Sequence, residues 1–186
     1  RELEDNNNVC LTNKIKTENR EAIAHFAEYP ITVFPPNRIV IRHSQNKNIP
    51  SKLSLSEAIE VYRLRIGITE GRSYGDRLDK EIKRLKQSLV VVAGETAEQR
   101  LRLMLQNNRI DALIEYSAVI LADTNIVDIV DSLTVHSIEE APNYVYGYIA
   151  CSKSTLGKKF ITQINAAIKK QKNNDYIIAE HAKIFS

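Results

Sequence analysis

The sequence predicts an α/β protein in which helices flank mixed, mostly parallel sheets. Strand-like and helix-like segments alternate through the middle of the chain with short loops between them, which favours parallel strands joined by helical crossovers. Further strands and helices flank this alternating block on both sides. The block contains expected strands at 65–69, 89–93 and 111–115 and expected helices at 76–88, 96–107 and 117–122.

The order of segments also predicts two lobes. If the two flanks pack together, they form one lobe and the inserted block forms the other. We expect lobe one at 1–42 plus 140–186 and lobe two at 43–139. Two connections then cross between the lobes and act as a hinge, and a cleft between hinged lobes is a natural ligand site.

The N-terminal flank is expected to hold one helix between short strands. Thr17 is a suitable N-cap with Glu18 in the first turn, so the helix should run to about Ala27 before Pro30 ends the segment. Residues 1–8 are polar and rich in Asn, which is typical of a loop or a frayed end. The expected strands of this flank are 9–12, 31–34 and 38–42.

The remaining elements follow from capping signals and apolar periodicity. Ser54 is expected to cap a helix at about 55–62. The helix at 76–88 is predicted by an apolar stripe at helical spacing, formed by Leu78, Ile82, Leu85 and Leu89. Short apolar segments follow at 126–131 and 133–137, then a β-branched and aromatic strand at 144–151 and helices at 155–171 and 174–184.

The turn EGRSYGD, residues 70–76, joins a strand to a helix in the inserted block. Gly71 and Gly75 permit backbone conformations that side chains forbid, so amide N–H groups of the turn can approach a ligand closely. A helix N-terminus carries free N–H donors and partial positive charge, which attract carboxylate or phosphate. Ser73 or Asp76 can equally cap the helix, and the turn is then an ordinary connection.

Composition and charge argue against several classes of function. The 186 residues carry a net charge of +3 that is spread along the chain, without the basic cluster that indicates a nucleic-acid partner. No apolar run approaches the ~20 residues that span a bilayer. The 4 histidines share no metal-ligand spacing, and the common hydrolase, zinc-protease and phosphate-loop motifs are absent from the sequence. We therefore expect no enzyme, metal site or cofactor.

The 2 cysteines are Cys10 and Cys151. Their spacing fits neither a zinc motif nor a C-x-x-C redox motif. They are either two unrelated buried thiols or one long-range disulfide, and the disulfide would require an oxidising compartment.

Four segments carry a resemblance to a known family. They are KTENREAIAHFAEYPITVFPPNRIVIR, LSEAIEVYRLRIGITEGRSYGDRLDKEI, AEQRLRLMLQNNRIDALIEYS and YGYIACSKSTLGKKFITQINAAI. In this order and spacing they resemble the type 2 periplasmic solute-binding proteins, namely the bacterial extracellular solute-binding family 3, which includes amino-acid receptors of ABC transporters. The resemblance covers nearly the whole chain and implies a two-lobe fold with two hinge strands.

The resemblance implies two carboxylate-binding groups. The family's T-x-x-R segment corresponds to Thr17–Arg20, and its Arg grips the ligand's carboxylate, for which a planar guanidinium is well suited. The family's G-x-[ST]-x turn corresponds to Gly71–Tyr74 and forms the second clamp. The candidate ligand-binding residues of that clamp are Ser73, Tyr74 and Arg72.

The largest departure from the family concerns the residue that pairs with the ligand's amine. In the family's G-R-x-D-A-x-x-x-D segment this residue is the last Asp, and its place is taken here by Tyr116, with Glu115 just before it. Both are candidate ligand-binding residues, although adjacent residues of a strand point to opposite faces. Asp111 matches the earlier, structural Asp of the segment. The implied ligand is small, polar and carboxylate-bearing.

The resemblance also implies an incomplete first lobe and a disulfide. Family members begin with a βαβ unit of about 30 or more residues, and no counterpart precedes Arg1, so we expect lobe one to lack this unit. The protein is then a monomer, unless a second copy replaces the unit. Cys10 and Cys151 would both lie in lobe one near neighbouring strand ends, which favours a disulfide and a periplasmic location.

The implied function is solute capture by hinge closure, with delivery of a small-molecule ligand to a membrane permease for ABC-type uptake. One alternative is the ligand-sensing extracytoplasmic domain of a signalling protein. A less favoured alternative is a periplasmic enzyme on the same fold.

Overall fold

The computed structural model describes residues 2–42, 48–116, 119 and 131–170. The chain divides into two compact units, Arg1–Pro35 with Asn143–Ser186, and Pro36–Pro142. These boundaries differ from the expected ones at 42/43 and 139/140. The first boundary lies earlier than expected because strand β4 (Asn37–Arg42) pairs with two strands of the second unit. The segments expected at 117–122, 126–131 and 174–184 lie wholly or mostly outside the described residues.

The first unit is built around strand β10 (Val145–Ser152), against which three other strands pair antiparallel. These strands are β1 (Cys10–Ile15), β2 (Ala24–Phe26) and β3 (Thr32–Phe34). β1 and β2 therefore run in the same direction, but β10 lies between them. The expected sheet was mostly parallel, but the described sheet of this unit is antiparallel. The reason is that β10 lies between β1 and β2, so these two strands do not pair with each other.

Helix α2 (Glu18–Ile23) begins at the expected N-cap, and the Thr17 side chain accepts a hydrogen bond from the Arg20 amide. The helix ends earlier than expected. Residues Ala24–Phe26 form β2 instead, because their backbone pairs with Ala150, Cys151 and Ser152 of β10. A short helix, α1 (Glu2–Asp5), takes part of the expected N-terminal loop.

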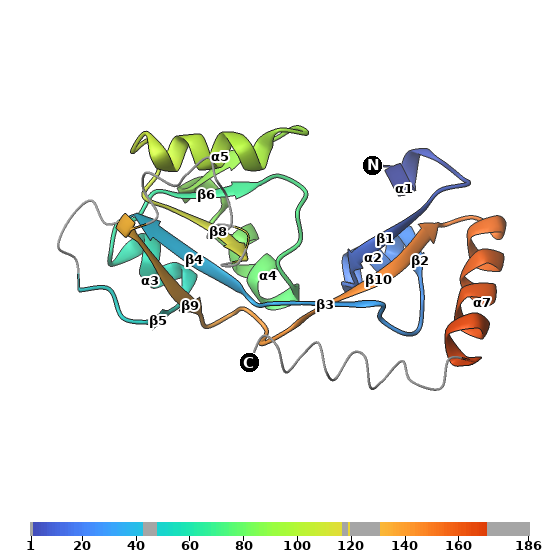
Figure 1. The fold of residues 1–186 in the computed structure, drawn as a ribbon. Helices are drawn as coiled ribbons and strands as arrows, with labels where there is room; N and C mark the ends of the chain where they lie inside the picture. The colour runs from blue at the N-terminus through green and yellow to red at the C-terminus, as the bar shows by residue number, and fades with distance from the viewer. Residues whose placement is uncertain (1, 43–47, 117–118, 120–130, 171–186) are drawn as a thin grey trace. The chain divides into compact units, whose positions relative to one another are not determined.

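Helix α7 (Thr155–Lys170) packs on β10 and β2 of the first unit (Figure 1). Its apolar side contributes Ile161 to a small core with Ala27 and Cys151. The expected helix at 155–171 and strand at 144–151 are thus present within one residue of their predicted ends.

The second unit holds a six-stranded mixed sheet in the order β5-β9-β4-β8-β6-β7. β6 pairs parallel with β7 and β8, and β5 pairs parallel with β9, while β4 pairs antiparallel with both β8 and β9. The strands are β5 (Lys52–Leu53), β6 (Ile66–Thr69), β7 (Leu89–Val92), β8 (Ala112–Tyr116) and β9 (Leu133–Ile138).

Helices cover both faces of this sheet: α5 (Ala97–Gln106) on one, and α3 (Leu55–Glu60) and α4 (Asp76–Arg84) on the other (Figure 1). Alternation along β4 explains the two cores. Ile39 and Ile41 join the core under α3 and α4, while Val40 joins the core under α5. Both faces of the strand are therefore buried, as its continuous apolar run requires.

The capping signals of the second unit have mixed outcomes. Ser54 caps α3 as expected and forms a reciprocal capping box with Glu57. The N-cap of α4, however, is Gly75 with φ of +103°, and neither Ser73 nor Asp76 caps the helix. The expected helix at 76–88 ends at Arg84, and a short 3₁₀ turn, η1 (Lys86–Ser88), follows it.

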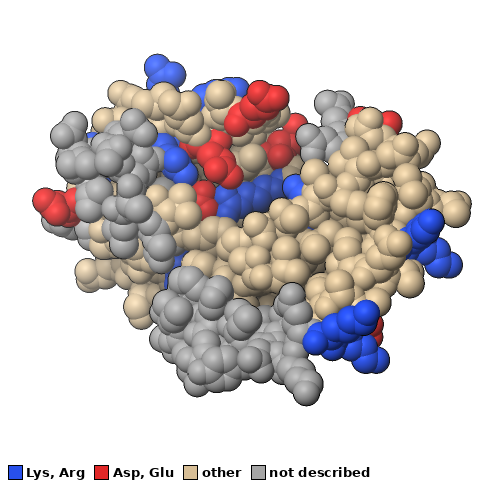
Figure 2. Space-filling model, turned by 45° about the vertical axis from the view of Figure 1, so that its right-hand side comes forward, with Lys and Arg blue, Asp and Glu red and all other residues tan. Residues whose placement is uncertain are grey.

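On the face drawn in Figure 2, acidic and basic side chains lie next to one another, and uncharged residues make up most of the described surface. Within the described part of the chain, no helix combines the length and the apolar character that crossing a membrane would require.

Candidate functional site

The turn between β6 and α4 contains the candidate residues of the second unit. Gly71 and Gly75 adopt positive φ values of +74° and +103°, which glycine reaches without steric cost. Between them, Ser73 and Tyr74 are 6% and 1% exposed. The two glycines thus fold the turn inward and bury the side chains that the sequence singled out.

A carboxylate is bound in this turn, and it belongs to Asp79 of α4. The Ser73 hydroxyl donates to Asp79 Oδ2 at 2.6 Å, and the Tyr74 amide donates to Asp79 Oδ1 at 2.7 Å. The donors expected to clamp a ligand's carboxylate are engaged here by a side chain of the same chain. Asp79 was not among the residues predicted from the sequence. Its position in the first turn of α4 was the feature that could have indicated it.

Arg72 lies in a compact group of aromatic and acidic side chains. Its Nη1 donates to Glu115 Oε2 at 2.8 Å and its Nη2 donates to Glu115 Oε1 at 2.6 Å, which makes a two-pronged ion pair. Its guanidinium carbon lies 5.1 Å from the ring centre of Tyr74 and 5.0 Å from that of Tyr116. Glu98, which is half exposed, adds a further contact at 3.2 Å.

Burial and charge act in opposite directions on the ionisable groups of this cluster. Burial acts to lower the pKa of Arg72, but hydrogen bonds with Glu115 and its negative charge outweigh burial and raise that pKa, so Arg72 stays a cation. Burial raises the pKa of Tyr74 to about 12 and also raises the pKa of Tyr116. Both phenols therefore remain neutral near neutral pH.

The structure brings four of the six candidate residues together, namely Arg72, Tyr74, Glu115 and Tyr116. Although Glu115 and Tyr116 are adjacent in β8, Arg72 contacts the carboxylate of one and the ring of the other. Ser73 lies beside this group but points to Asp79. Sequence reasoning also missed Glu98, which nothing in the local pattern marks.

Arg20 belongs to the first unit and is half-buried in α2. Its Nη1 donates to the carbonyl oxygen of Ile15 at 3.3 Å. Nearby, Lys16 pairs with Glu21 at 3.2 Å, and its ammonium lies 5.7 Å from the ring centre of Tyr148. The side chain of Arg20 is thus placed beside the end of β1 in a polar and aromatic neighbourhood.

Asp111 has the structural role that its place in the sequence suggested. Its carboxylate accepts hydrogen bonds from the Arg65 amide at 2.8 Å and from Arg65 Nε at 2.9 Å. These bonds join the start of β8 to the start of β6. Among the described residues, no group of three or more His, Cys, Asp and Glu side chains is arranged to hold a metal ion.

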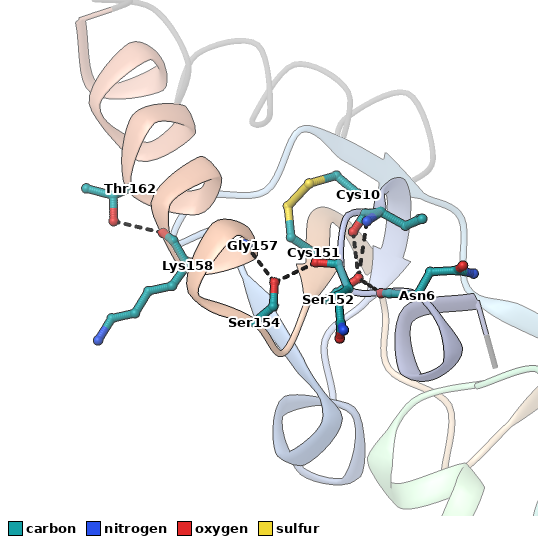
Figure 3. The surroundings of a disulfide bond; sticks show 10 residues. Asn6, Cys10, Cys151, Ser152, Ser154, Gly157, Lys158 and Thr162 are labelled. Carbon is teal, nitrogen blue, oxygen red and sulfur yellow. Dashed lines mark hydrogen bonds between the residues drawn. A yellow bond between two sulfur atoms is a disulfide. The ribbon is translucent and has the colours of Figure 1, made fainter.

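Cys10 and Cys151 form a disulfide, which confirms the pairing that the family resemblance implied (Figure 3). The two residues face each other across the β1–β10 ladder, with their Cα atoms 4.0 Å apart. Next to the bond, the Ser152 hydroxyl donates to the carbonyl oxygen of Asn6, and the Ser154 hydroxyl accepts from the Gly157 amide (Figure 3). The bridge thus ties the two sequence flanks of the first unit together.

A pocket of about 240 Å³ lies beside the turn, within the second unit. Its apolar lining comes from Ile68, Ile82 and Val91, and its charged lining includes Glu70, Arg72, Asp79, Lys83 and Lys86. Tyr74 also lines the pocket, so the Arg72–Tyr74 side of the cluster borders a hollow of the surface.

No protein-family model matches this sequence, and no curated protein matches it. Solved structures do match. An arginine-bound mutant of the arginine-binding protein ArgBP from T. maritima has a TM-score of 0.59 and 18% identity, covering 86% of this chain and 65% of that one. The chain has the two-lobe fold of the periplasmic binding proteins. We refer to the first unit as lobe one and to the second unit as lobe two.

Two further structures share this two-lobe fold. The substrate-binding protein of an amino acid ABC transporter has a TM-score of 0.61 and 14% identity, covering 99% of this chain and 71% of that one. The BvgS periplasmic domain of B. pertussis has a TM-score of 0.56 and 18% identity, covering 95% of this chain and 29% of that one. The chain spans 65% of the length of the T. maritima protein.

Proposed function

We propose that this protein is an extracytoplasmic solute-binding protein that closes on a small, polar, carboxylate-bearing ligand. Arg20 of lobe one holds the carboxylate with its planar guanidinium. Ser73, Tyr74 and the N-terminus of α4 hold the ligand from lobe two. Contacts from both lobes are made only in the closed form, so ligand binding shifts the population toward closure.

The observation that carries this proposal is the carboxylate of Asp79 at the start of α4. The Ser73 hydroxyl and the Tyr74 amide reach its two oxygens at 2.6 and 2.7 Å, which are distances of strong charge-assisted hydrogen bonds. The donors of the turn are therefore arranged to suit a carboxylate. A ligand's carboxylate would take the same donors by exchanging with Asp79.

We place the protein in the periplasm and assign it a role in uptake of an amino-acid-like solute through a membrane permease. The Cys10–Cys151 disulfide supports an oxidising compartment. The solved structures with this fold include the receptor of an amino acid ABC transporter and arginine-binding proteins, which support a small-molecule partner and argue for binding rather than enzymatic chemistry.

A sensor domain is the second candidate, and the BvgS periplasmic domain favours it, since that structure covers 95% of this chain. The complete coding sequence distinguishes the two. A membrane span and a signalling domain in the same polypeptide support the sensor, whereas genes for a permease and an ATPase beside it support transport.

Native mass spectrometry of the purified protein tests the proposed function directly. We expect a co-purified small molecule, and a thermal-shift screen with arginine, glutamine, glutamate and dicarboxylic acids should identify compounds that raise the melting temperature. Neutral sugars serve as the control set. If no acid raises the melting temperature and nothing co-purifies, the proposed function is wrong.

A further inference from the structure

Arg72 is bound by its own chain in the way that proteins bind a free guanidinium ion. Two of its N–H groups donate to the two oxygens of one carboxylate, that of Glu115, at 2.8 and 2.6 Å. Its guanidinium plane lies about equally close to two aromatic rings, 5.1 Å from Tyr74 and 5.0 Å from Tyr116. We call the three side chains Tyr74, Tyr116 and Glu115 the guanidinium cage.

The geometry of the cage suits a planar guanidinium rather than a compact ammonium. Two parallel N–H···O bonds to one carboxylate require a rigid fork of donors, and ring faces attract a flat, weakly hydrated cation. The carboxylate is also poorly hydrated, because the side chain of Glu115 is only 5% exposed. A buried carboxylate without a cation is costly, so the cage needs an occupant.

The walls of the cage are held in place by contacts that do not involve Arg72. The Tyr74 hydroxyl accepts from the Thr69 amide at 3.1 Å. Glu115 and Tyr116 belong to β8, whose backbone is in register with β4. The cage should therefore keep its shape when the Arg72 side chain is removed.

One wall of the cage borders a hollow of the surface. Tyr74 lines the pocket of about 240 Å³ beside the turn, and so does Arg72, the occupant of the cage. The neighbouring Gly71 has no atom within 4 Å of the position where a Cβ would lie, so the backbone that carries Arg72 is not packed in on that side. Removing the Arg72 side chain should open a path from this pocket to Glu115, because that side chain both lines the pocket and contacts the carboxylate.

We propose that Tyr74, Tyr116 and Glu115 form a guanidinium-binding site whose occupant in this structure is Arg72 of the same chain. A soluble guanidinium cation competes with Arg72 for this site. The inference concerns lobe two alone and holds whether or not Arg20 binds a ligand, so each can fail independently of the other.

Arg72→Ala with methylguanidinium chloride as the probe tests the proposal. We expect methylguanidinium to bind this variant saturably, at least about tenfold more tightly than the wild type, because two charge-assisted bonds become available. The melting temperature of the variant should rise on saturation. Methylammonium chloride at equal ionic strength is the control ligand, and Arg77→Ala is the matched control variant, since Arg77 is an exposed arginine five residues away.

The double variant Arg72→Ala with Glu115→Gln should lose the methylguanidinium response, because the forked acceptor is then gone. The proposal is overturned if methylguanidinium affects Arg72→Ala no more than Arg77→Ala, or no more than methylammonium does. If Arg72→Ala does not fold, Arg72→Lys decides the matter. Lysine keeps the positive charge but cannot donate two parallel hydrogen bonds to one carboxylate. The melting temperature of this variant should therefore lie well below that of wild type, and an unchanged melting temperature contradicts the proposal.

Discussion

Arg72 and Glu115, 43 residues apart in the chain, form a two-pronged ion pair that joins the turn before α4 to the end of β8. The side chain of Arg72 is 16% exposed and that of Glu115 is 5% exposed. Removing one member of such a pair leaves the other charge buried without its partner, which costs far more than losing a surface pair.

Glu115→Gln should lower the free energy of unfolding by about 2–3 kcal/mol, because Arg72 loses its buried charged acceptor. The loss is limited because Arg72 keeps its ion pair with Glu98. Urea unfolding followed by circular dichroism measures this loss. The matched control is Glu81→Gln, which breaks the exposed pair with Arg84 and should cost under about 0.5 kcal/mol. Equal effects of the two substitutions would show that the Arg72–Glu115 pair contributes no more than a surface contact.

Tyr74 should make stability fall with pH in the alkaline range. Burial raises the pKa of Tyr74 to about 12, while tyrosine in the unfolded chain titrates near ~10. The folded state thus holds the phenol proton more tightly. Its contribution is complete below ~pH 10 and is lost as pH rises from there to about 12.

Tyr74→Phe removes this titration. Between ~pH 9 and ~pH 12 the unfolding free energy of wild type should fall relative to that of the variant by on the order of 2 kcal/mol. Urea unfolding at a series of pH values provides the comparison, and Tyr116, whose pKa burial also raises, is present in both proteins. Parallel pH profiles for the two proteins would contradict the shifted pKa.

Reduction of Cys10–Cys151 should lower the free energy of unfolding by about 3–5 kcal/mol in the chain-entropy model. The effect is large because the bond joins residues 141 positions apart. The measurement is urea unfolding with and without dithiothreitol, together with a mass gain of two hydrogens on reduction.

The variant with both cysteines replaced by serine is the control for reduction. Its unfolding should not respond to dithiothreitol. If wild type unfolds at the same urea concentration in both conditions despite full reduction, the disulfide does not stabilise lobe one.

Arg20→Ala should weaken binding of any carboxylate found in the thermal-shift screen by at least about tenfold, because charge-assisted hydrogen bonds are worth ~1.5–3 kcal/mol. Calorimetric titration measures the dissociation constant. Lys158→Ala is the control, since Lys158 is an exposed cation of the same lobe. Arg20 also holds the carbonyl of Ile15, so the melting temperature of the variant is checked first. An unchanged dissociation constant would remove Arg20 from the proposed site.

The sequence by itself determined the features that depend on neighbouring residues. The basic and apolar residues of Arg38–Arg42 predicted a strand, and the structure buries its apolar residues Ile39, Val40 and Ile41 in two cores. Ser54 predicted the start of α3, because a hydroxyl N-cap acts within one helical turn. Short-range periodicity and capping are sufficient for such elements, which is why most predicted segments appear within a few residues of their expected ends.

The tertiary structure alone decided which distant groups meet. Residues Ala24–Phe26 continue a helical pattern in sequence but form a strand, because β10 offers them a pairing edge from more than a hundred positions away. Asp79 takes the donors of Ser73 and Tyr74, and Arg72 meets both Glu115 and Tyr116. Such contacts depend on the folded path of the backbone, so no local pattern of residues could have specified them.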